Sequence, residues 1–232
     1  MDTTSGPRIV AHRGASATHK ENTAAAFEAA RDQGAHGIEL DVRRTADDVL
    51  VIHHDATLAD GRVIRRINAD ELPDDVPSLA EALEQCADLW LNIEIKNERG
   101  DPDYDLGISI AVAALVAAYD AHDRVLVSSF DVDSVLRIRE LDPTIPIGML
   151  VFGQADIRSL IGRAEAHAMQ AIHPHDVMVD QTFVDIAHAA GLEVNVWTVD
   201  DPDRLRALAA LGVDGLITNH PANAIAALAD AD

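Results

Sequence analysis

Carboxylate side chains stand at alternating positions in two short apolar runs. In Gly-Ile-Glu-Leu-Asp-Val, residues 37–42, a strand would place Glu39 and Asp41 on one face and the apolar side chains on the other. Glu94 and Lys96 alternate in the same way in Asn-Ile-Glu-Ile-Lys. Three carboxylates without a thiolate are hard oxygen ligands, which suit Mg²⁺ or Ca²⁺. The pattern predicts a divalent-cation site; the alternative is a set of ion pairs with the neighbouring bases.

Two histidines end apolar runs close to these acids in the sequence. His12 ends the first run and is followed by Arg13, and His54 ends the run that begins at Val49. Imidazoles exchange protons near neutral pH, and the guanidinium of Arg13 with the ammonium of Lys96 can neutralise a phosphate group. Together with the acids, these residue types at strand ends indicate a metal and proton-transfer site. A purely structural, hydrogen-bonded histidine at each strand end is the alternative.

Strand and helix patterns that could position these residues alternate along the chain with short connections. Eight such units favour a parallel sheet closed into a single (β/α)8 TIM barrel, with residues 1–232 forming one domain. The first strand is not followed by Gly-x-Gly-x-x-Gly, which argues against a dinucleotide fold. We expect the eight strands at residues 8–12, 36–42, 89–96, 125–130, 147–152, 171–173, 192–199 and 213–218, and a hairpin-like extension at 49–54.

The carboxyl ends of barrel strands are where barrel enzymes carry their chemistry, and the charged residues above fall at such ends. Trp197 ends the seventh predicted strand and serves either as barrel packing or as a wall for an alcohol moiety. His173 and His175, at the end of the sixth, are weaker candidates for the site. The segment from Gly61 to Asp75 is expected to be a polar connection. A helix is expected at residues 22–33, for which Asn22 is a reasonable cap.

The composition is strongly acidic, with 40 Asp and Glu against 18 Lys and Arg and a formal net charge of -22. Such a surface repels nucleic acid and anionic membranes, so neither partner is expected. Lysine occurs only at Lys20 and Lys96, a pattern typical of proteins from salt-loaded cytoplasms. We therefore expect the melting temperature to rise between low and molar KCl; an unchanged value would contradict the halophilic interpretation.

The chain contains a single cysteine, Cys86, so no intramolecular disulfide or cysteine metal cluster can form. The polar residues 1–8 do not resemble a signal peptide, and no apolar run approaches the length of a membrane span. These features predict a soluble cytoplasmic protein without stable membrane association. The sequence does not indicate an oligomeric state.

Several motifs, taken in order along nearly the whole chain, resemble the glycerophosphodiester phosphodiesterase family. The resemblance implies a (β/α)8 barrel that uses a divalent cation to hydrolyse small glycerophosphodiesters to an alcohol and glycerol phosphate. Two positions depart from the family pattern: Lys20 replaces the usual proline, and Asn219 replaces the usual aspartate. The motifs are His12-Arg13-Gly14, Glu21-Asn22-Thr23, Glu39-Leu40-Asp41-Val42, His54-Asp55, Pro77-Ser78-Leu79-Ala80-Glu81, Glu94-Ile95-Lys96, Ser129-Phe130, Trp197-Thr198-Val199 and Gly215-Leu216-Ile217-Thr218.

The resemblance also implies roles for individual residues, including His54 as the general acid. The nearest rival activity is a phospholipase D or C type reaction on lipids, and a catalytically silent phosphate-binding barrel is a further alternative. The implied site residues are His12 and His54 for proton transfer, Arg13, Lys96 and Trp197 for substrate binding, and Glu39, Asp41 and Glu94 for Mg²⁺ or Ca²⁺.

Overall fold

Strands and helices alternate through the whole described chain, as the apolar pattern predicts. The structure, a computed structural model, describes residues 6–97, 99–100, 104–153 and 156–229. The strands in this part are β1 (Arg8–His12), β2 (Gly37–Arg44), β3 (Leu50–Ile52), β4 (Trp90–Ile95), β5 (Val125–Ser129), β6 (Ile147–Val151), β7 (Ala171–Pro174), β8 (Glu193–Val196) and β9 (Gly215–Thr218). The α-helices are α1 (Ala24–Asp32), α2 (Leu79–Gln85), α3 (Gly107–Ala118), α4 (Val132–Leu141), α5 (Ile157–Ala166), α6 (Gln181–Ala189), α7 (Pro202–Leu211) and α8 (Pro221–Ala229).

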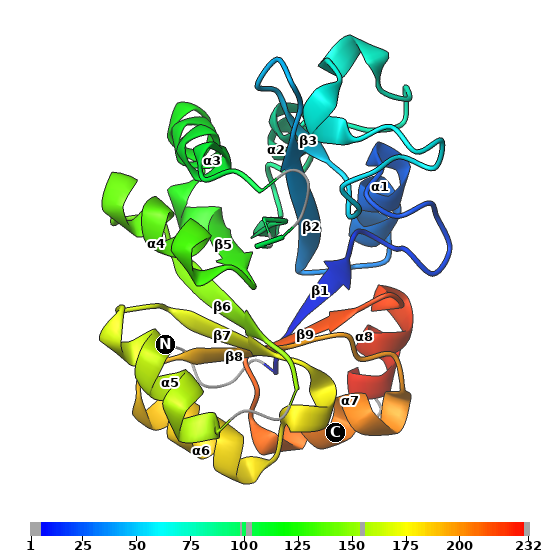
Figure 1. The fold of residues 1–232 in the computed structure, drawn as a ribbon. Helices are drawn as coiled ribbons and strands as arrows, with labels where there is room; N and C mark the ends of the chain where they lie inside the picture. The colour runs from blue at the N-terminus through cyan, green and yellow to red at the C-terminus, as the bar shows by residue number, and fades with distance from the viewer. Residues whose placement is uncertain (1–5, 98, 101–103, 154–155, 230–232) are drawn as a thin grey trace.

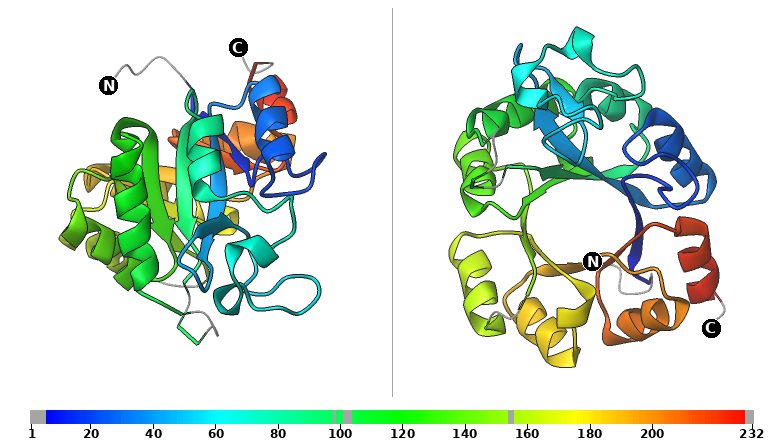
Figure 2. Two further views of the ribbon diagram at one scale, coloured as in Figure 1. Left: turned by 90° about the horizontal axis from the view of Figure 1, so that it is seen from above. Right: turned by 45° about the vertical axis from the view of Figure 1, so that its right-hand side comes forward.

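Eight of these strands are parallel and close into a ring. Strand β1 pairs with β9 on one side and with β2 on the other, which joins the two ends of the sheet. The helices lie outside the ring, and the closed barrel is seen most directly in Figures 1 and 2. The predicted (β/α)8 TIM barrel is therefore confirmed. Among the described helices, none has the length and apolar character that crossing a bilayer requires.

Strand β3 is antiparallel to β2 and lies outside the ring, which is the hairpin-like extension expected from the sequence. Two short 3₁₀ helices, η1 (Ile64–Arg66) and η2 (Ala69–Glu71), follow it. The prediction of a merely polar connection at 61–75 was incomplete, because four apolar side chains form a small core of their own here. They are Val51, Leu58, Ile64 and Ile67.

Local sequence signals set the ends of the outer helices. Ser78 caps α2 and its backbone amide hydrogen-bonds to Glu81, a capping box that satisfies amide groups at the helix start. Helix α1 begins at Ala24 and is capped by Thr23, whereas Asn22 was the cap suggested by the sequence. Apolar side chains between the helices and the ring form the main core, which includes the fully buried Phe27 and Phe183.

The inside of the ring is unusually polar below its carboxyl rim. Asn92, Ser128, His173 and Asn195 are all buried, and the Asn195 amide nitrogen lies 3.4 Å from Nε2 of His173. Gly148 leaves room for this imidazole, since a Cβ there would lie 2.8 Å from Nε2. Burial lowers the pKa of His173 to about 3, so that it is neutral at pH 7. His173 is thus enclosed by the barrel.

Candidate active site

Seven of the eight predicted site residues line one pocket at the carboxyl rim of the barrel. This site pocket has a volume of about 90 Å³ and is bounded by the ends of β1, β2 and β4, by the segment after β3, and by aromatic and aliphatic side chains. The eighth residue, Asp41, is fully buried and contacts two of the lining residues, Arg13 and Lys96. The structure therefore brings together residues that are up to 185 positions apart, from His12 to Trp197. The lining residues are His12, Arg13, Glu39, His54, Asn92, Glu94, Lys96, Phe130, Leu150, Trp197 and Ile217.

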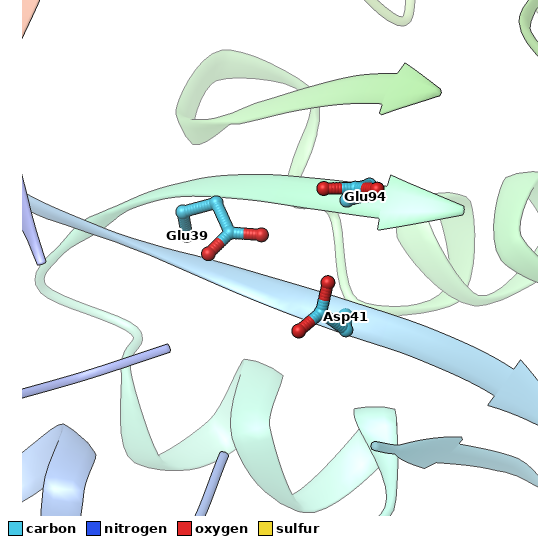
Figure 3. Close-up of side chains that lie close together, drawn as sticks. All are labelled: Glu39, Asp41 and Glu94. Atoms are coloured by element: carbon cyan, nitrogen blue, oxygen red, sulfur yellow. The ribbon is translucent and has the colours of Figure 1, made fainter. Parts of the chain in front are cut away.

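The three predicted cation ligands form one cluster on two adjacent strands. Glu39 and Asp41 alternate on β2, and the parallel register places Glu94 of β4 opposite Asp41. One oxygen from each carboxylate lies within 4.8 Å of the others, and the side chains project to the same side of the sheet (Figure 3). Within the described residues, Glu39 Oε1 and Asp41 Oδ1 are buried and accept no hydrogen bond. Such oxygens fit a hard divalent cation.

The ion pairs offered as the alternative are also present. Arg13 Nε lies 3.0 Å from Asp41 Oδ2, and Lys96 Nζ lies 2.7 Å from Glu94 Oε1 and 3.6 Å from Asp41 Oδ1. They satisfy only part of the cluster, since Glu39 Oε1 keeps no partner among the described side chains. The two interpretations are thus compatible, with two bases and a cation sharing three carboxylates.

Burial and mutual repulsion act differently on the three carboxylates. Burial, followed by the charges of Asp41 and Glu94, raises the pKa of Glu39 well above its ordinary value. Burial and the charge of Asp41 likewise raise the pKa of Glu94 to about 7. Burial opposes ionisation of Asp41 too, but Lys96 and Arg13 outweigh it and lower its pKa. Two of the three acids therefore resist ionisation until more positive charge is added.

A chain of hydrogen bonds fixes the orientation of His12. Asn219 donates through Nδ2 to Asp200 Oδ2 at 2.7 Å, and its backbone N–H donates to Asp200 Oδ1 at 2.8 Å. Because a carboxylate only accepts, the amide oxygen of Asn219 must face His12 Nδ1, which is 2.7 Å away. Nδ1 of His12 is then the protonated nitrogen, and Nε2 keeps a lone pair 3.9 Å from Glu39 Oε2.

His54 is also held through its Nδ1 atom, in this case by the side chain of the next residue, Asp55. Its Nδ1 lies 2.7 Å from Asp55 Oδ1, so that Nδ1–H donates to the carboxylate and Nε2 is free. Burial lowers the pKa of both His54 and His12, although the charge of Asp41 opposes the shift in each case. In both imidazoles, Nδ1 is therefore engaged by a neighbouring side chain and Nε2 is not.

A tight turn after β1 places Arg13 against the acids. Arg13 adopts a positive φ of 56°, and Gly14 follows with a φ of 81°. A Cβ on Gly14 would lie 2.6 Å from the backbone carbon of Ala26 in α1, so only glycine fits this approach. The guanidinium contacts Glu21 at 2.9 Å as well as Asp41.

Two asparagines that support the site were missed or misread in the sequence. Asn22 also has a positive φ, 57°, and donates through Nδ2 to Asp41 Oδ2 at 2.8 Å, so it orients a carboxylate and does not cap α1. Asn219 was noted only as a departure from a family pattern. Asn22 belongs to the Glu21-Asn22-Thr23 motif of the resemblance, and the tolerance of asparagine for left-handed backbone is a second signal that could have identified it.

Trp197 packs in the barrel and also lines the site pocket, so the structure is compatible with both roles considered from the sequence. Its indole Nε1 donates to the His173 carbonyl oxygen at 2.8 Å, which anchors it in the barrel, and its ring also lines the site pocket. The rings of Phe130 and His175 pack edge-on against it, at centroid distances of 5.5 and 5.0 Å. His175 therefore supports the aromatic side of the pocket.

Removing the Asn219 contact should impair proton transfer without unfolding the barrel. We expect Asn219→Leu to lower kcat about 10- to 100-fold, because His12 would no longer be held in the Nδ1–H tautomer. Ser16→Ala is the matched control, since Ser16 Oγ donates to the same Asn219 oxygen at 2.8 Å without touching His12. Equal kcat values for the two variants would show that the tautomer is not set by Asn219.

Active sites of barrel enzymes lie at the carboxyl rim, and imidazoles beside an acidic cluster there are candidates for proton transfer and cation binding. The model of the glycerophosphoryl diester phosphodiesterase family matches residues 12–223 of this chain. A glycerophosphodiester phosphodiesterase of Caldanaerobacter subterraneus subsp. tengcongensis is 32% identical over 234 residues, covering 92% of this chain and 94% of its own. The chain therefore belongs to the glycerophosphoryl diester phosphodiesterase family and is a phosphoric diester hydrolase.

Solved structures show the same fold over nearly the full length. A phosphodiesterase of Oleispira antarctica, in complex with the product sn-glycerol-3-phosphate, has a TM-score of 0.88 at 26% identity and covers 97% of both chains. A glycerophosphodiester phosphodiesterase of Thermotoga maritima has a TM-score of 0.82 at 26% identity, covering 96% of this chain and 98% of its own.

Proposed function

We propose that this enzyme hydrolyses small glycerophosphodiesters with two histidines as general base and general acid, next to a divalent cation bound by Glu39, Asp41 and Glu94. The observation that carries the proposal is the convergence of these three carboxylates with two Nδ1-tethered imidazoles on one pocket. The product bound by the Oleispira antarctica relative supports the glycerophosphate half of the substrate. We also propose a cytoplasmic location, from the sequence features described above.

The charges of the site match a phosphodiester once a divalent cation is included. With all three carboxylates ionised, the cluster would carry one negative charge in excess of Arg13 and Lys96. Mg²⁺ or Ca²⁺ would convert this to one excess positive charge, equal and opposite to the single charge of the diester. When bound, the cation would polarise the phosphate oxygens and stabilise the charge that develops on them.

The chain's own side chains then perform the remaining steps. Arg13 and Lys96 bind the non-bridging oxygens of the phosphate and orient it. His12 Nε2 accepts the proton of the attacking hydroxyl group, from water or from the substrate's own glycerol, while Asn219 holds the ring. Attack by the glycerol hydroxyl leaves a cyclic phosphate, which water then opens to glycerol phosphate as His54 accepts the proton of the water and His12 returns its proton to the glycerol oxygen. His54, in its protonated form, donates its Nε2 proton to the departing alcohol, and the Asp55 carboxylate stabilises the imidazolium.

The direct test measures glycerol phosphate released from a panel of glycerophosphodiesters with Mg²⁺, with Ca²⁺ and with EDTA. We expect turnover with at least one of the two ions and none with EDTA. Turnover that persists in EDTA would contradict the cation site, and binding without turnover under every condition would favour the silent barrel.

A lipid phosphodiesterase is a second candidate, favoured by an exposed aromatic side chain beside Trp197 of the pocket and by a second exposed apolar side chain after β7. Phe152 is 65% exposed, and its ring lies 4.9 Å from that of His175 and 6.3 Å from that of Trp197. Val177, just after β7, is 78% exposed. Lysophosphatidylcholine belongs in the same panel: faster cleavage of it than of glycerophosphocholine would favour this candidate.

A further inference from the structure

Arg43 is a buried arginine that has no part in the proposed reaction. It alternates with Glu39 and Asp41 on β2, so it belongs to the same face of the strand as those two acids. Arg43 is 5% exposed, yet it does not line the site pocket. Burial of a guanidinium is costly unless its N–H groups are bonded, so its hydrogen bonds indicate what it does.

Two of these hydrogen bonds join Arg43 to the main chain of residues with proposed roles in the reaction. Its Nε donates to the carbonyl oxygen of His54 at 2.8 Å, and its Nη1 donates to the carbonyl oxygen of Lys96 at 3.3 Å. Because the guanidinium is planar, its donors hold the two carbonyl groups in a fixed relation to each other. Arg43 therefore connects the backbone of the proposed proton donor with the backbone of a phosphate-binding lysine.

The segment that follows β3 has few other main-chain hydrogen bonds. Residues 53–56 belong to no helix or strand. The first of them donates its N–H to the Asp41 carbonyl oxygen at 2.9 Å, and the last accepts a hydrogen bond from the N–H of Ile64 at 3.0 Å. Between these two points, in the part of the chain that the structure describes, the hydrogen bond from Arg43 to the His54 carbonyl oxygen joins the segment to the barrel.

We propose that Arg43 is a positioning residue, which holds the main chain of His54 where its imidazole reaches the departing oxygen of a phosphate bound by Lys96. The proposal rests on the proposed function, because Arg43 acts through the proton that His54 donates. Without the guanidinium, the segment after β3 would lose its contact with the barrel at His54. A displacement of about 1 Å can slow a reaction about 10²-fold.

The direct test is Arg43→Met, assayed by single-turnover release of the leaving alcohol from two substrates. For glycerophosphocholine, whose alcohol needs a proton as it departs, we expect the rate to fall about 10- to 100-fold. For the p-nitrophenyl diester of glycerol phosphate, whose phenolate needs no proton, the rate should fall less than about threefold. Any effect on phosphate binding through Lys96 is common to both substrates and cancels in the ratio of the two rates.

Two further substitutions distinguish positioning from a merely structural role. Arg43→Lys keeps the charge but has no planar fork of donors, so its ratio should lie between those of Arg43→Met and the unchanged protein. The matched control is Arg44→Met, which removes the next guanidinium along β2, one that is paired with the carboxylates of Asp48 and Asp105. Both methionine variants should have a lower melting temperature, but Arg44→Met should leave the ratio unchanged.

A double variant tests whether Arg43 acts through His54. Once the imidazole is removed by His54→Ala, there is no proton donor left to position. Addition of Arg43→Met should then slow release of choline less than about twofold further, because the effects of coupled residues do not add.

The possible failures are distinguishable. Absence of turnover by the unchanged protein with every glycerophosphodiester overturns the proposed function and this inference with it. Turnover in which Arg43→Met slows both substrates equally leaves the proposed function intact and overturns the inference alone. A double variant that loses the full factor of Arg43→Met on top of that of His54→Ala also overturns it, since Arg43 would then act independently of His54.

Discussion

His12→Ala is expected to lower kcat about 10²- to 10⁴-fold for every glycerophosphodiester, whatever its leaving alcohol. The reason is that His12 Nε2 accepts the proton of the attacking group, a step common to all substrates. Its ring is fixed through Nδ1 by Asn219, so a neighbouring base cannot take its place without a new support. The measurement is the steady-state rate of glycerol phosphate release.

His54→Ala should instead show an effect that depends on the leaving group. An alkyl alcohol needs a proton as it departs, so kcat for a substrate with such a leaving group should fall by a similar factor. A p-nitrophenolate needs no proton, so kcat for a p-nitrophenyl substrate should fall little. The difference is tested by comparing kcat for glycerophosphocholine with kcat for the p-nitrophenyl diester of glycerol phosphate. His19→Ala is the control, since His19 is exposed and does not line the site pocket. A reversed pattern would exchange the roles of His12 and His54.

Asp41→Asn should abolish most of the activity, by about 10² to 10³ in kcat, and weaken cation binding. Asp41 is fully buried, and its carboxylate contacts both Arg13 and Lys96. The amide keeps the size of the side chain but removes one negative charge beside Arg13 and Lys96. The remaining positive charge of these two groups would repel a divalent cation. The rise in melting temperature on adding Mg²⁺ or Ca²⁺ should therefore shrink. Glu21→Gln, which removes an exposed partner of Arg13, should retain that rise.

The same rise in melting temperature should depend on pH. The pKa of Glu94, raised to about 7 mainly by burial, lies above the value of an unfolded glutamate. In the absence of a cation, the folded protein therefore loses stability as pH rises and Glu94 ionises towards pH 7. Below pH 7, the proton on Glu94 competes with the cation. We expect a larger cation-induced rise at pH 8 than at pH 5.5, and equal rises would contradict the ligand assignment.

The sequence allowed the barrel and the members of the carboxylate cluster to be predicted because both follow from short-range periodicity. The period of two placed Glu39 and Asp41 on one face, and the alternation of strands and helices indicated parallel strands. Inter-strand register is not encoded in such a pattern. The structure supplies it by placing Glu94 opposite Asp41.

Contacts between distant segments could not be predicted in the same way. His12 and Asn219 are 207 residues apart, and only closure of the ring between β1 and β9 brings them to 2.7 Å. The sequence suggests Asn22 as a helix cap because asparagine is common at the N-cap position. In the structure, its left-handed backbone turns the side chain towards Asp41. Tertiary geometry, in both cases, overrides the local preference.

Strand β3 lies outside the closed ring, and it delivers His54 from a segment that belongs to none of the eight repeating units. One of the two proposed proton carriers thus comes from a segment outside the ring, and the other comes from strand β1 of the ring itself. Changes of length or composition in the segment outside the ring can alter which alcohols are accepted while the hydrogen-bonded closure of the ring stays intact. The choice of alcohol can therefore change through the segment around β3 without a change in the closed barrel.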